Sequence, residues 1–374
     1  MDRMSLTTEP QAKSAMCPTV LLSIVWMMMA PARVCGVIES QRPAAMLRYP
    51  LVLVQDDGPG QRVDTEIELA NTRDDRAVRV QCFYVDGSGR CSTDTTTECF
   101  EDGHCAGEQT CVFTCPANSF VVQLTPRQAL GWVAGQGLSA LPCSVPDRCP
   151  DQINHGSIPP VANRFTGGLE CIELSTEIDG IPGVPVARND LIGAATIVQR
   201  RNAEKPLASA YSAIGVEAVG SNNGDRELTL GGPAAEYEPC PDTLTGNVLF
   251  DGAVLDGTSG KLGLVAFLMP CARDFATQRP VEAIADVRIF NEFEQRSSLR
   301  LSVKCSHIMS HDLLHIALQG TLSGQIRIRG SRADGSEHAE PLLGILRALS
   351  TNDSADYHFS AQALSVEETV IRLP

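Results

Sequence analysis

The sequence predicts an all-β fold of two tandem antiparallel β-sandwich domains, the first of which carries a disulfide-rich insertion. Three observations lead to this prediction. From Leu51 onward, short segments of alternating apolar and polar residues are separated by Gly, Pro, Asp and Asn. One pattern of strands and turns occurs twice along the chain. The chain contains 14 cysteines, most of them within the first copy of this pattern.

The length and charge of the chain limit the classes of protein that it can be. At about 150 residues per domain, 374 residues suffice for two domains and a processed segment. The 30 Lys and Arg residues against 45 Asp and Glu residues give a formal net charge of -15. This is the wrong sign for a protein that neutralises phosphates, so we expect no nucleic-acid partner.

The amino terminus has the features of a secretory signal. Arg3 and Lys13 precede an apolar run from Val20 to Ala30, and Ala30-Pro31-Ala32 has the small-x-small pattern of a signal-peptidase site. We therefore predict that residues 1–32 are a signal peptide. The mature protein is then secreted or at the cell surface, in the periplasm or outside the cell.

Two alternatives concern the same segment. The stretch from Ser14 to Ala32 is uncharged and could be retained as a membrane anchor, although its strongly apolar centre has only the length of a signal. Cys35 could carry a lipid, but Arg33 and Val34 are unsuited to a lipid-attachment box. No long apolar stretch follows, so no transmembrane segment is expected after signal removal.

Alternation with a period of two predicts the strands. In Thr65–Leu69 and in Val78–Cys82 every second residue is apolar or cysteine, which predicts half-buried strands. Similar alternation occurs in Leu169–Leu174, Val287–Ile289, Leu299–Cys305 and Gln325–Arg329. The clusters Asp86-Gly87, Ser221–Gly224 and Asp256-Gly257 supply turns for hairpins. Short helices are expected only at Pro126–Trp132 and Ser310–Leu318.

An internal duplication sets the predicted domain limits. Ile67-x-Leu69-x-Asn71 followed by Val78-x-Val80-x-Cys82 recurs as Val287-x-Ile289-x-Asn291 followed by Leu301-x-Val303-x-Cys305. Later matches keep the same order: Gly167–Leu169 with Gly320–Leu322, Leu191–Gly193 with Leu342–Gly344, Ala210-Tyr211 with Asp356-Tyr357, and Glu227–Leu230 with Val370–Leu373. We predict domains at 45–235 and 245–374, with a cysteine-rich insertion at about 87–118 in the first.

The segment Val78–Gly87, with the strand and Asn-Thr turn before it, resembles immunoglobulin-like repeats of secreted bacterial surface proteins. The resemblance implies a β-sandwich architecture and no particular activity. The spacing Cys99-x5-Cys105-x5-Cys111-x3-Cys115 resembles short cysteine-rich cassettes of secreted bacterial proteins, which implies disulfides and is silent on function.

The insertion is predicted to depend on disulfides. Between Asp86 and Cys111 its only apolar side chains other than cysteine are Phe100 and Ala106, so hydrophobic burial cannot order it. The candidate disulfide cysteines are Cys82, Cys91, Cys99, Cys105, Cys111, Cys115, Cys143, Cys149, Cys171, Cys240, Cys271 and Cys305.

Counting cysteines constrains their pairing. Removal of Cys17 with the signal leaves thirteen of the 14, an odd number, and Cys35 is the best candidate for the unpaired thiol. Cys82 and Cys171 lie on predicted strands of one sandwich and could bridge it. One of the three cysteines of the second unit must pair outside that group: Cys240, Cys271 or Cys305.

Three metal-binding alternatives compete with these disulfides, and no cofactor is predicted. Zinc could bind in the insertion, where His104 lies beside Cys105, but the cysteine spacing is irregular. Calcium could bind its carboxylates, Asp94, Glu98, Glu101 and Asp102, although no EF-hand spacing is present. The row His307, His311 and His315 could hold a metal only if it were helical, because in a strand the outer two would lie about 26 Å apart.

No catalytic signature occurs: the sequence lacks a Gly-x-Ser-x-Gly elbow, a His-Glu-x-x-His helix, a phosphate loop and a Gly-x-Gly-x-x-Gly turn. We therefore expect an exported or cell-surface structural or binding protein without catalytic activity. Its partner would be an extracellular protein or surface component of unknown identity. The alternatives are an extracellular hydrolase with a site built from loops, and a metal-binding surface protein.

Overall fold

The computed structural model describes ten stretches of the chain: residues 42–58, 61–139, 157–175, 183–201, 206–249, 263–309, 323–333, 339–349, 354–362 and 368–374. All of them belong to one compact unit, Cys35–Pro374. The predicted signal peptide and Cys35 lie outside the described residues. Within them the fold is all-β, as predicted, with several antiparallel sheets and a single 3-10 turn, η1 (Asp102–His104).

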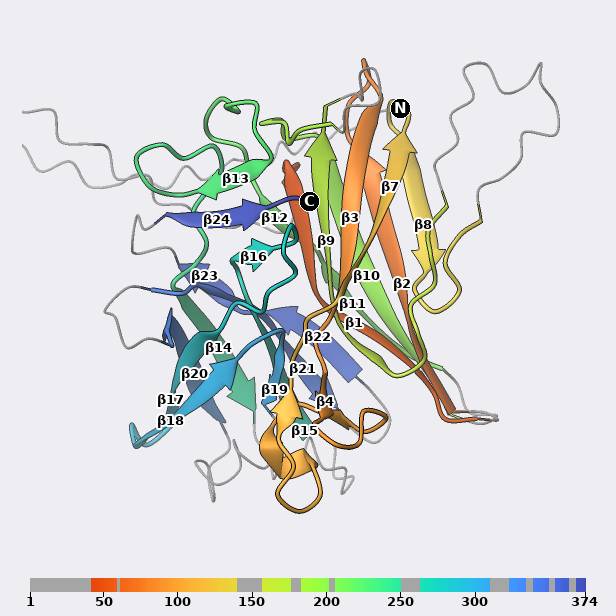
Figure 1. Cartoon of the computed structure of the whole chain (residues 1–374). Coiled ribbons are helices and arrows are strands. Elements are labelled where there is room, and N and C mark those ends of the chain that lie inside the picture. The colour runs from red at the N-terminus through yellow and green to blue at the C-terminus, as the bar shows by residue number, and fades with distance from the viewer. Residues whose placement is uncertain are drawn as a thin grey trace, which may run out of the picture. The chain divides into compact units, whose positions relative to one another are not determined.

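The largest sheet has nine strands in the order β11-β10-β2-β1-β9-β3-β7, with β12 paired to β1 and β8 to β2 (Figure 1). These strands are β1 (Met46–Asp56), β2 (Gln61–Asn71), β3 (Val78–Asp86), β7 (Ala117–Leu124), β8 (Ala129–Val133), β9 (Phe165–Leu174), β10 (Leu191–Arg201), β11 (Leu207–Ser212) and β12 (Ile214–Val216). A register shift between Tyr49 and Val52 interrupts the pairing of β1 with β9.

The middle strands of this sheet are buried on both faces. In β9, Leu169 and Cys171 lie in one hydrophobic core, whereas Ile172 and Leu174 lie in another. The strand β3 behaves in the same way. Within Val78–Cys82 the predicted apolar face is buried and Arg79 on the other face is half-exposed, although Gln81 is buried. The second core covers this other face from Phe83 onward, beyond the predicted segment. At β2 the prediction is correct, since Ile67 and Leu69 are buried and the glutamates between and before them are exposed.

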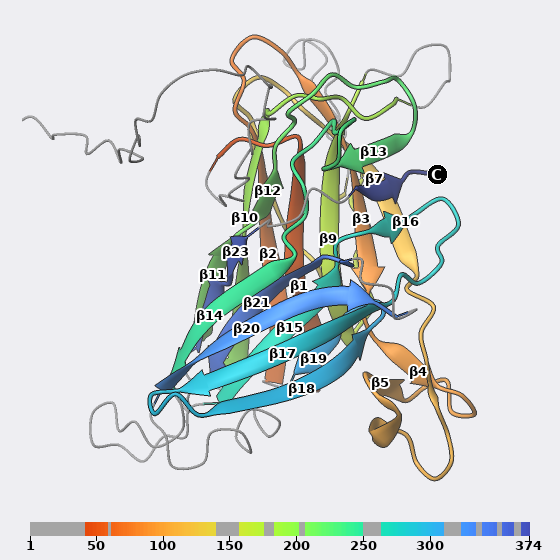
Figure 2. The ribbon, with the colours of Figure 1, turned by 90° about the vertical axis from the view of Figure 1, so that its left-hand side faces the viewer.

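Two further sheets enclose a third core. A five-stranded sheet has the order β18-β17-β20-β14-β23, and a four-stranded sheet has the order β19-β15-β21-β22 (Figure 2). Their strands are β14 (Thr243–Leu249), β15 (Gly263–Pro270), β17 (Ala283–Asn291), β18 (Arg296–Val303), β19 (His307–Met309), β20 (Ser323–Arg332), β21 (Leu342–Leu349), β22 (Ser354–His358) and β23 (Ser360–Gln362). Val287, Ile289, Ile326 and Ile328 point inward from the larger sheet and pack with Leu346 of the smaller one.

A small sheet joins distant parts of the chain. It contains β13 (Glu227–Leu230), β24 (Thr369–Arg372) and β16 (Arg273–Asp274). Strand β24 pairs antiparallel with β13 and parallel with β16. Segments from both predicted domains thus share one sheet, and both also contribute to the second core. The two-domain, immunoglobulin-like arrangement stays a prediction.

The helix expected at Pro126–Trp132 is absent, and that prediction is wrong. Arg127 has a φ of 57°, which ends any helical continuation, and β8 follows from Ala129. Leu130 and Trp132 alternate with exposed neighbours and pair with β2, so the five residues follow a period of two. The helix expected at Ser310–Leu318 lies outside the described residues.

The repeated sequence pattern corresponds to a shared turn but to different pairings. Asn71 and Asn291 each end a strand, and the side-chain Oδ1 of each accepts a hydrogen bond from the N–H two residues on, at 2.9 and 3.0 Å. After this turn β17 and β18 form a hairpin, whereas β3 pairs with β9 and β7. The duplication stays a prediction.

Candidate functional site: a disulfide-held knob

Five disulfides join described cysteines: Cys82–Cys171, Cys91–Cys105, Cys99–Cys111, Cys115–Cys305 and Cys240–Cys271. Cys82 and Cys171 face each other in the register of β3 and β9, as the sequence suggested. Of the three cysteines in the predicted second domain, Cys305 is the one that pairs elsewhere. Cys143 and Cys149 lie outside the described residues.

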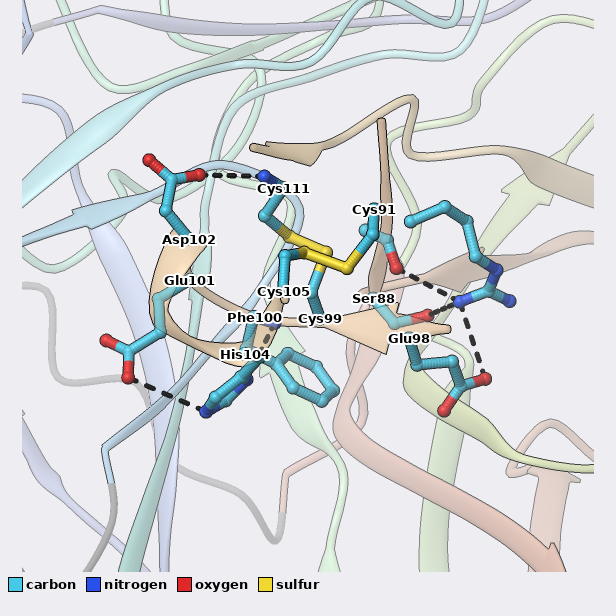
Figure 3. Close-up of a disulfide and its surroundings, with 12 residues drawn as sticks. Ser88, Cys91, Glu98, Cys99, Phe100, Glu101, Asp102, His104, Cys105 and Cys111 are labelled. Carbon is cyan, nitrogen blue, oxygen red and sulfur yellow. Dashed lines mark hydrogen bonds and ion pairs between the residues drawn. A yellow bond between two sulfur atoms is a disulfide. The ribbon is translucent and has the colours of Figure 1, made fainter. Parts of the chain in front are cut away.

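Two of these disulfides lie in a short segment, residues 89–115, which we call the knob. Its strands are β4 (Gly89–Cys91), β5 (Glu98–Cys99) and β6 (Cys111–Val112), which form a three-stranded sheet. Figure 3 shows the two disulfides lying side by side between these strands. The four cysteines are at most 8% exposed and form a core of their own, against which Phe113 packs. Sulfur thus takes the place of hydrophobic side chains in the knob.

Gly89 is required for the disulfides of the knob to fit. A Cβ atom at this position would lie 2.6 Å from the Sγ atom of Cys111 and 2.9 Å from the carbonyl oxygen of Val112. Both distances are shorter than real Cβ contacts. A larger residue at Gly89 would therefore force β4 away from β6.

The base of the knob is fixed to the segment that follows β18. The Cys115–Cys305 disulfide joins the two covalently. The Ser306 hydroxyl donates a hydrogen bond to the carbonyl oxygen of Gly87 at 3.2 Å, and the Lys304 ammonium lies 5.7 Å from the centre of the Phe113 ring. Covalent, polar and cation–π contacts therefore hold the knob in one orientation.

Polar side chains fix the exposed loops of the knob. Asp94 accepts hydrogen bonds from the hydroxyls of Thr96 and Thr97, both at 2.6 Å. Because these bonds favour the ionised carboxyl, they lower the pKa of Asp94 to about 2. Asp102 accepts a hydrogen bond from the Cys111 N–H at 2.7 Å (Figure 3). The loops are held by local hydrogen bonds and not by burial.

The outer surface of the knob is acidic. It contains five carboxylates, Asp94, Glu98, Glu101, Asp102 and Glu108, and all except Glu98 are exposed. Its one basic residue with a permanent charge, Arg90, lies at the base, 3.4 Å from Glu98 and 3.5 Å from Asp86. The knob therefore presents negative charge on a rigid support.

The metal-binding alternatives at the knob require groups that already have other partners. The sulfur atoms of Cys91, Cys99 and Cys105 lie within 4.8 Å of one another, but each is part of a disulfide. His104 accepts a hydrogen bond from the Phe100 N–H, and its Nε2 atom lies 3.5 Å from Glu101. Each of the four carboxylates considered for calcium likewise contacts a different protein group. These carboxylates are Asp94, Glu98, Glu101 and Asp102.

His307, the first histidine of the predicted metal row, lies in β19 beside the base of the knob and is 4% exposed. Neither ring nitrogen has a hydrogen-bond partner. Burial lowers the pKa of His307, while Glu101 acts in the opposite direction and His104 adds to the lowering. His311 and His315 lie outside the described residues, so the metal row stays a prediction.

Sequence reasoning missed a buried ionic group centred on β9. Glu170 is fully buried between two arginines, 2.9 Å from Arg48 and 3.0 Å from Arg273. The alternation around Glu170 suggested an exposed face. However, Glu170 and Glu173 are three residues apart and so lie on opposite faces of the strand, each among apolar residues. This spacing is the sequence signal that both faces of β9 are covered.

A second buried carboxyl group, that of Glu173, lies on the opposite face of β9. It is 1% exposed, 4.0 Å from Arg188, and near the buried Asp190, which pairs with Arg76 at 2.6 Å. Burial and the negative charge of Asp190 raise the pKa of Glu173 to about 8. Glu173 is therefore protonated near neutral pH in the folded protein.

We expect this proton to make folding stability depend on pH. Between pH 4.5 and 8 the folded state retains the proton that the unfolded state has released, so stability falls as the pH rises through this range. The loss at pH 8.5 relative to pH 5 should be about 4 kcal/mol from this residue. Urea unfolding of the wild type and of Glu173→Gln at both pH values measures it. The substitution Glu108→Gln, at an exposed position, is the control. If the stability of Glu173→Gln depended on pH as strongly as that of the wild type, the assignment would be wrong.

A hollow of about 440 Å³ lies on the nine-stranded sheet, over β2, β8 and β10. Its lining is mostly small and apolar, with Glu68 and Ser212 as the polar side chains. In the strand register Ala194 lies between them, opposite Glu68 on one side and Ser212 on the other.

The comparisons with known proteins add no assignment: the chain matches no protein-family model and no curated protein. Among the described residues there is no helix with the length and hydrophobicity needed to cross a membrane.

Proposed function

We propose that this chain is exported and acts, without catalysis, as a structural or binding protein at the cell surface, with the knob as its contact element. The observation that carries the proposal is the knob itself, whose only core is two disulfides. Five disulfides among the described residues suggest an oxidising compartment, extracellular or periplasmic, because cytosolic thiols are kept reduced.

The knob is suited to binding because its surface is ordered before any partner arrives. Disulfides fix its backbone, and Asp94 and Asp102 fix its loops. A pre-organised surface loses less conformational entropy on association than a flexible loop of the same composition. Its exposed carboxylates favour a partner with positive charge.

One observation favours the hydrolase as a second candidate. Glu173 is protonated near neutral pH, as a general acid must be. However, it is 1% exposed, and the charged groups near it, Arg188 and Asp190, belong to the same buried cluster. These contacts give Glu173 a structural role in the described part of the chain.

The test of the export proposal is the state of the chain in its natural host. We expect it to be recovered outside the cytoplasm with an intact mass that begins at Arg33. A peptide map should show Cys91–Cys105 and Cys99–Cys111 closed. Recovery of the full-length chain from the cytosol with these four thiols free to alkylation would refute the proposal.

A further inference from the structure

The outer face of the five-stranded sheet is rich in arginine. Along β17, β18 and β20 the residues alternate, so that one set packs in the core and the other faces outward. Five outward, exposed positions are arginines, which together we call the arginine face: Arg288, Arg296, Arg300, Arg327 and Arg329. Figure 2 shows these three strands at the front of the view.

The strand register brings these arginines together. Arg288 is directly opposite Arg327, and Asp286 lies between Arg300 and Arg329 in the next row. Neighbouring strands are about 4.8 Å apart, so the guanidinium groups of adjacent strands repel one another. Like charges directly opposite each other in a sheet reduce stability. Folding alone therefore gives no reason for this arrangement.

Few carboxylates neutralise the arginine face. Asp286 pairs with Arg300 at 3.0 Å. Within the described part of the chain, no ion pair is made by the other four arginines of the face. Glu292 and Glu294 lie in the turn at one end, where Glu292 accepts a hydrogen bond from the Ser323 N–H at 3.1 Å. A chain with a net charge of -15 thus concentrates positive charge on one sheet face.

We propose that the arginine face binds the knob of a second copy of this chain. The knob carries five carboxylates and one arginine, the opposite charge to the face. Arginine also forms paired hydrogen bonds with a carboxylate, which suits both surfaces. This inference rests on the proposed binding role of the knob and names its partner.

Apolar residues favour a second copy over a free polyanion. Three large hydrophobic residues are described as exposed, and two of them lie on or beside the two surfaces: Val112, 47% exposed, on the knob, and Phe293, 65% exposed, in the turn between β17 and β18. A polyphosphate would form ionic contacts with the arginine face but no apolar contact. A docked knob would form ionic and apolar contacts at once.

The contact joins two different surfaces, so a bound pair still exposes one free knob, on one copy, and one free arginine face, on the other. Such head-to-tail contacts generate rings or open chains of molecules. The negative charge elsewhere on the molecule opposes this only weakly, because charges more than about 8 Å apart are screened at physiological salt. For the same reason the association should weaken strongly as salt is added.

The test uses two neutralised variants. The face variant carries Arg288→Ser and Arg327→Ser, and the knob variant carries Glu101→Gln and Glu108→Gln. All four positions are exposed, so both variants should fold, which unchanged thermal unfolding verifies. A control variant carries Arg127→Ser and Glu66→Gln at exposed positions outside both surfaces.

Sedimentation velocity at physiological salt should show the wild type and the control forming larger species as concentration increases, and 0.5 M NaCl should dissociate them. Each neutralised variant alone should stay monomeric. A mixture of the two should form a dimer and nothing larger, because each copy retains one intact surface.

Three results would overturn the proposal: a monomeric wild type at every concentration, large species in either variant alone, or no dimer in the mixture. The face variant is also tested with polyphosphate. If the wild type binds polyphosphate through the arginine face and does not self-associate, then the occupant is a polyanion and the proposal is wrong. None of these results bears on export, which the mass and disulfide map decide separately.

Discussion

Replacing Glu170 with alanine should lower the free energy of unfolding by about 4 kcal/mol, because the change leaves two buried arginines without a counter-charge. The Arg48 and Glu170 side chains are 0% exposed, and that of Arg273 is 6% exposed. Burial already lowers the pKa of Arg48, with Glu170 opposing this effect. Equilibrium unfolding in guanidinium chloride, with disulfides intact, measures the loss.

Two further variants separate charge from packing. Glu170→Gln keeps the size of the side chain but removes its charge, so we expect a smaller loss than with alanine. The triple substitution Arg48→Met, Glu170→Leu and Arg273→Met replaces the whole group by apolar residues of similar volume and should recover most of the lost stability. A loss below about 1 kcal/mol for Glu170→Ala would show that the two arginines do not depend on this carboxylate.

The position of this ionic group explains why its loss should destabilise several elements of the fold. Arg48 also donates a hydrogen bond to the carbonyl oxygen of Cys271 at 2.6 Å, and Arg273 donates one to the carbonyl oxygen of Cys305 at 3.0 Å. Cys305 forms a disulfide with Cys115, 190 residues away, whereas Cys271 forms one with Cys240, 31 residues away. The group therefore connects β1 and β9 with Cys305, which anchors the knob, and with the Cys240–Cys271 bridge.

The sequence predicted those features that depend on nearby residues. The alternation at Ile67 and Leu69 identified β2 and its buried face, and the near absence of apolar residues before Cys111 identified a segment held by disulfides. The error at Pro126–Trp132 has a local cause, because a strand of five residues with two buried positions is too short to distinguish from one helical turn.

The features that the sequence did not predict depend on contacts between distant segments. Arg48, Glu170 and Arg273 lie far apart along the chain and meet only because a second core covers β9. The arginine face was not predicted for the same reason. The alternation of β17, β18 and β20 is visible in each strand alone, but Arg288 meets Arg327 only through the register of the sheet.

Removing the Cys115–Cys305 disulfide by Cys115→Ser and Cys305→Ser should have an effect of similar size, about 4 kcal/mol. The two cysteines are 190 residues apart, so the bond restricts a long loop of the unfolded chain. It also holds the base of the knob, where Ser306 contacts Gly87. We expect a lower midpoint of unfolding, together with faster hydrogen exchange of the amides around Gly87 and Ser306.

The matched control is the pair Cys99→Ser and Cys111→Ser, which opens a bridge between cysteines only 12 residues apart. Because that bridge lies within the knob and contacts only its small sulfur core, its removal should loosen the knob while leaving the global midpoint nearly unchanged. Equal shifts of the global midpoint in both variants would mean that the knob unfolds together with the sheets. In that case the knob is a part of the main folding unit, and its surface would be ordered by the sheets beneath it as well as by its own disulfides.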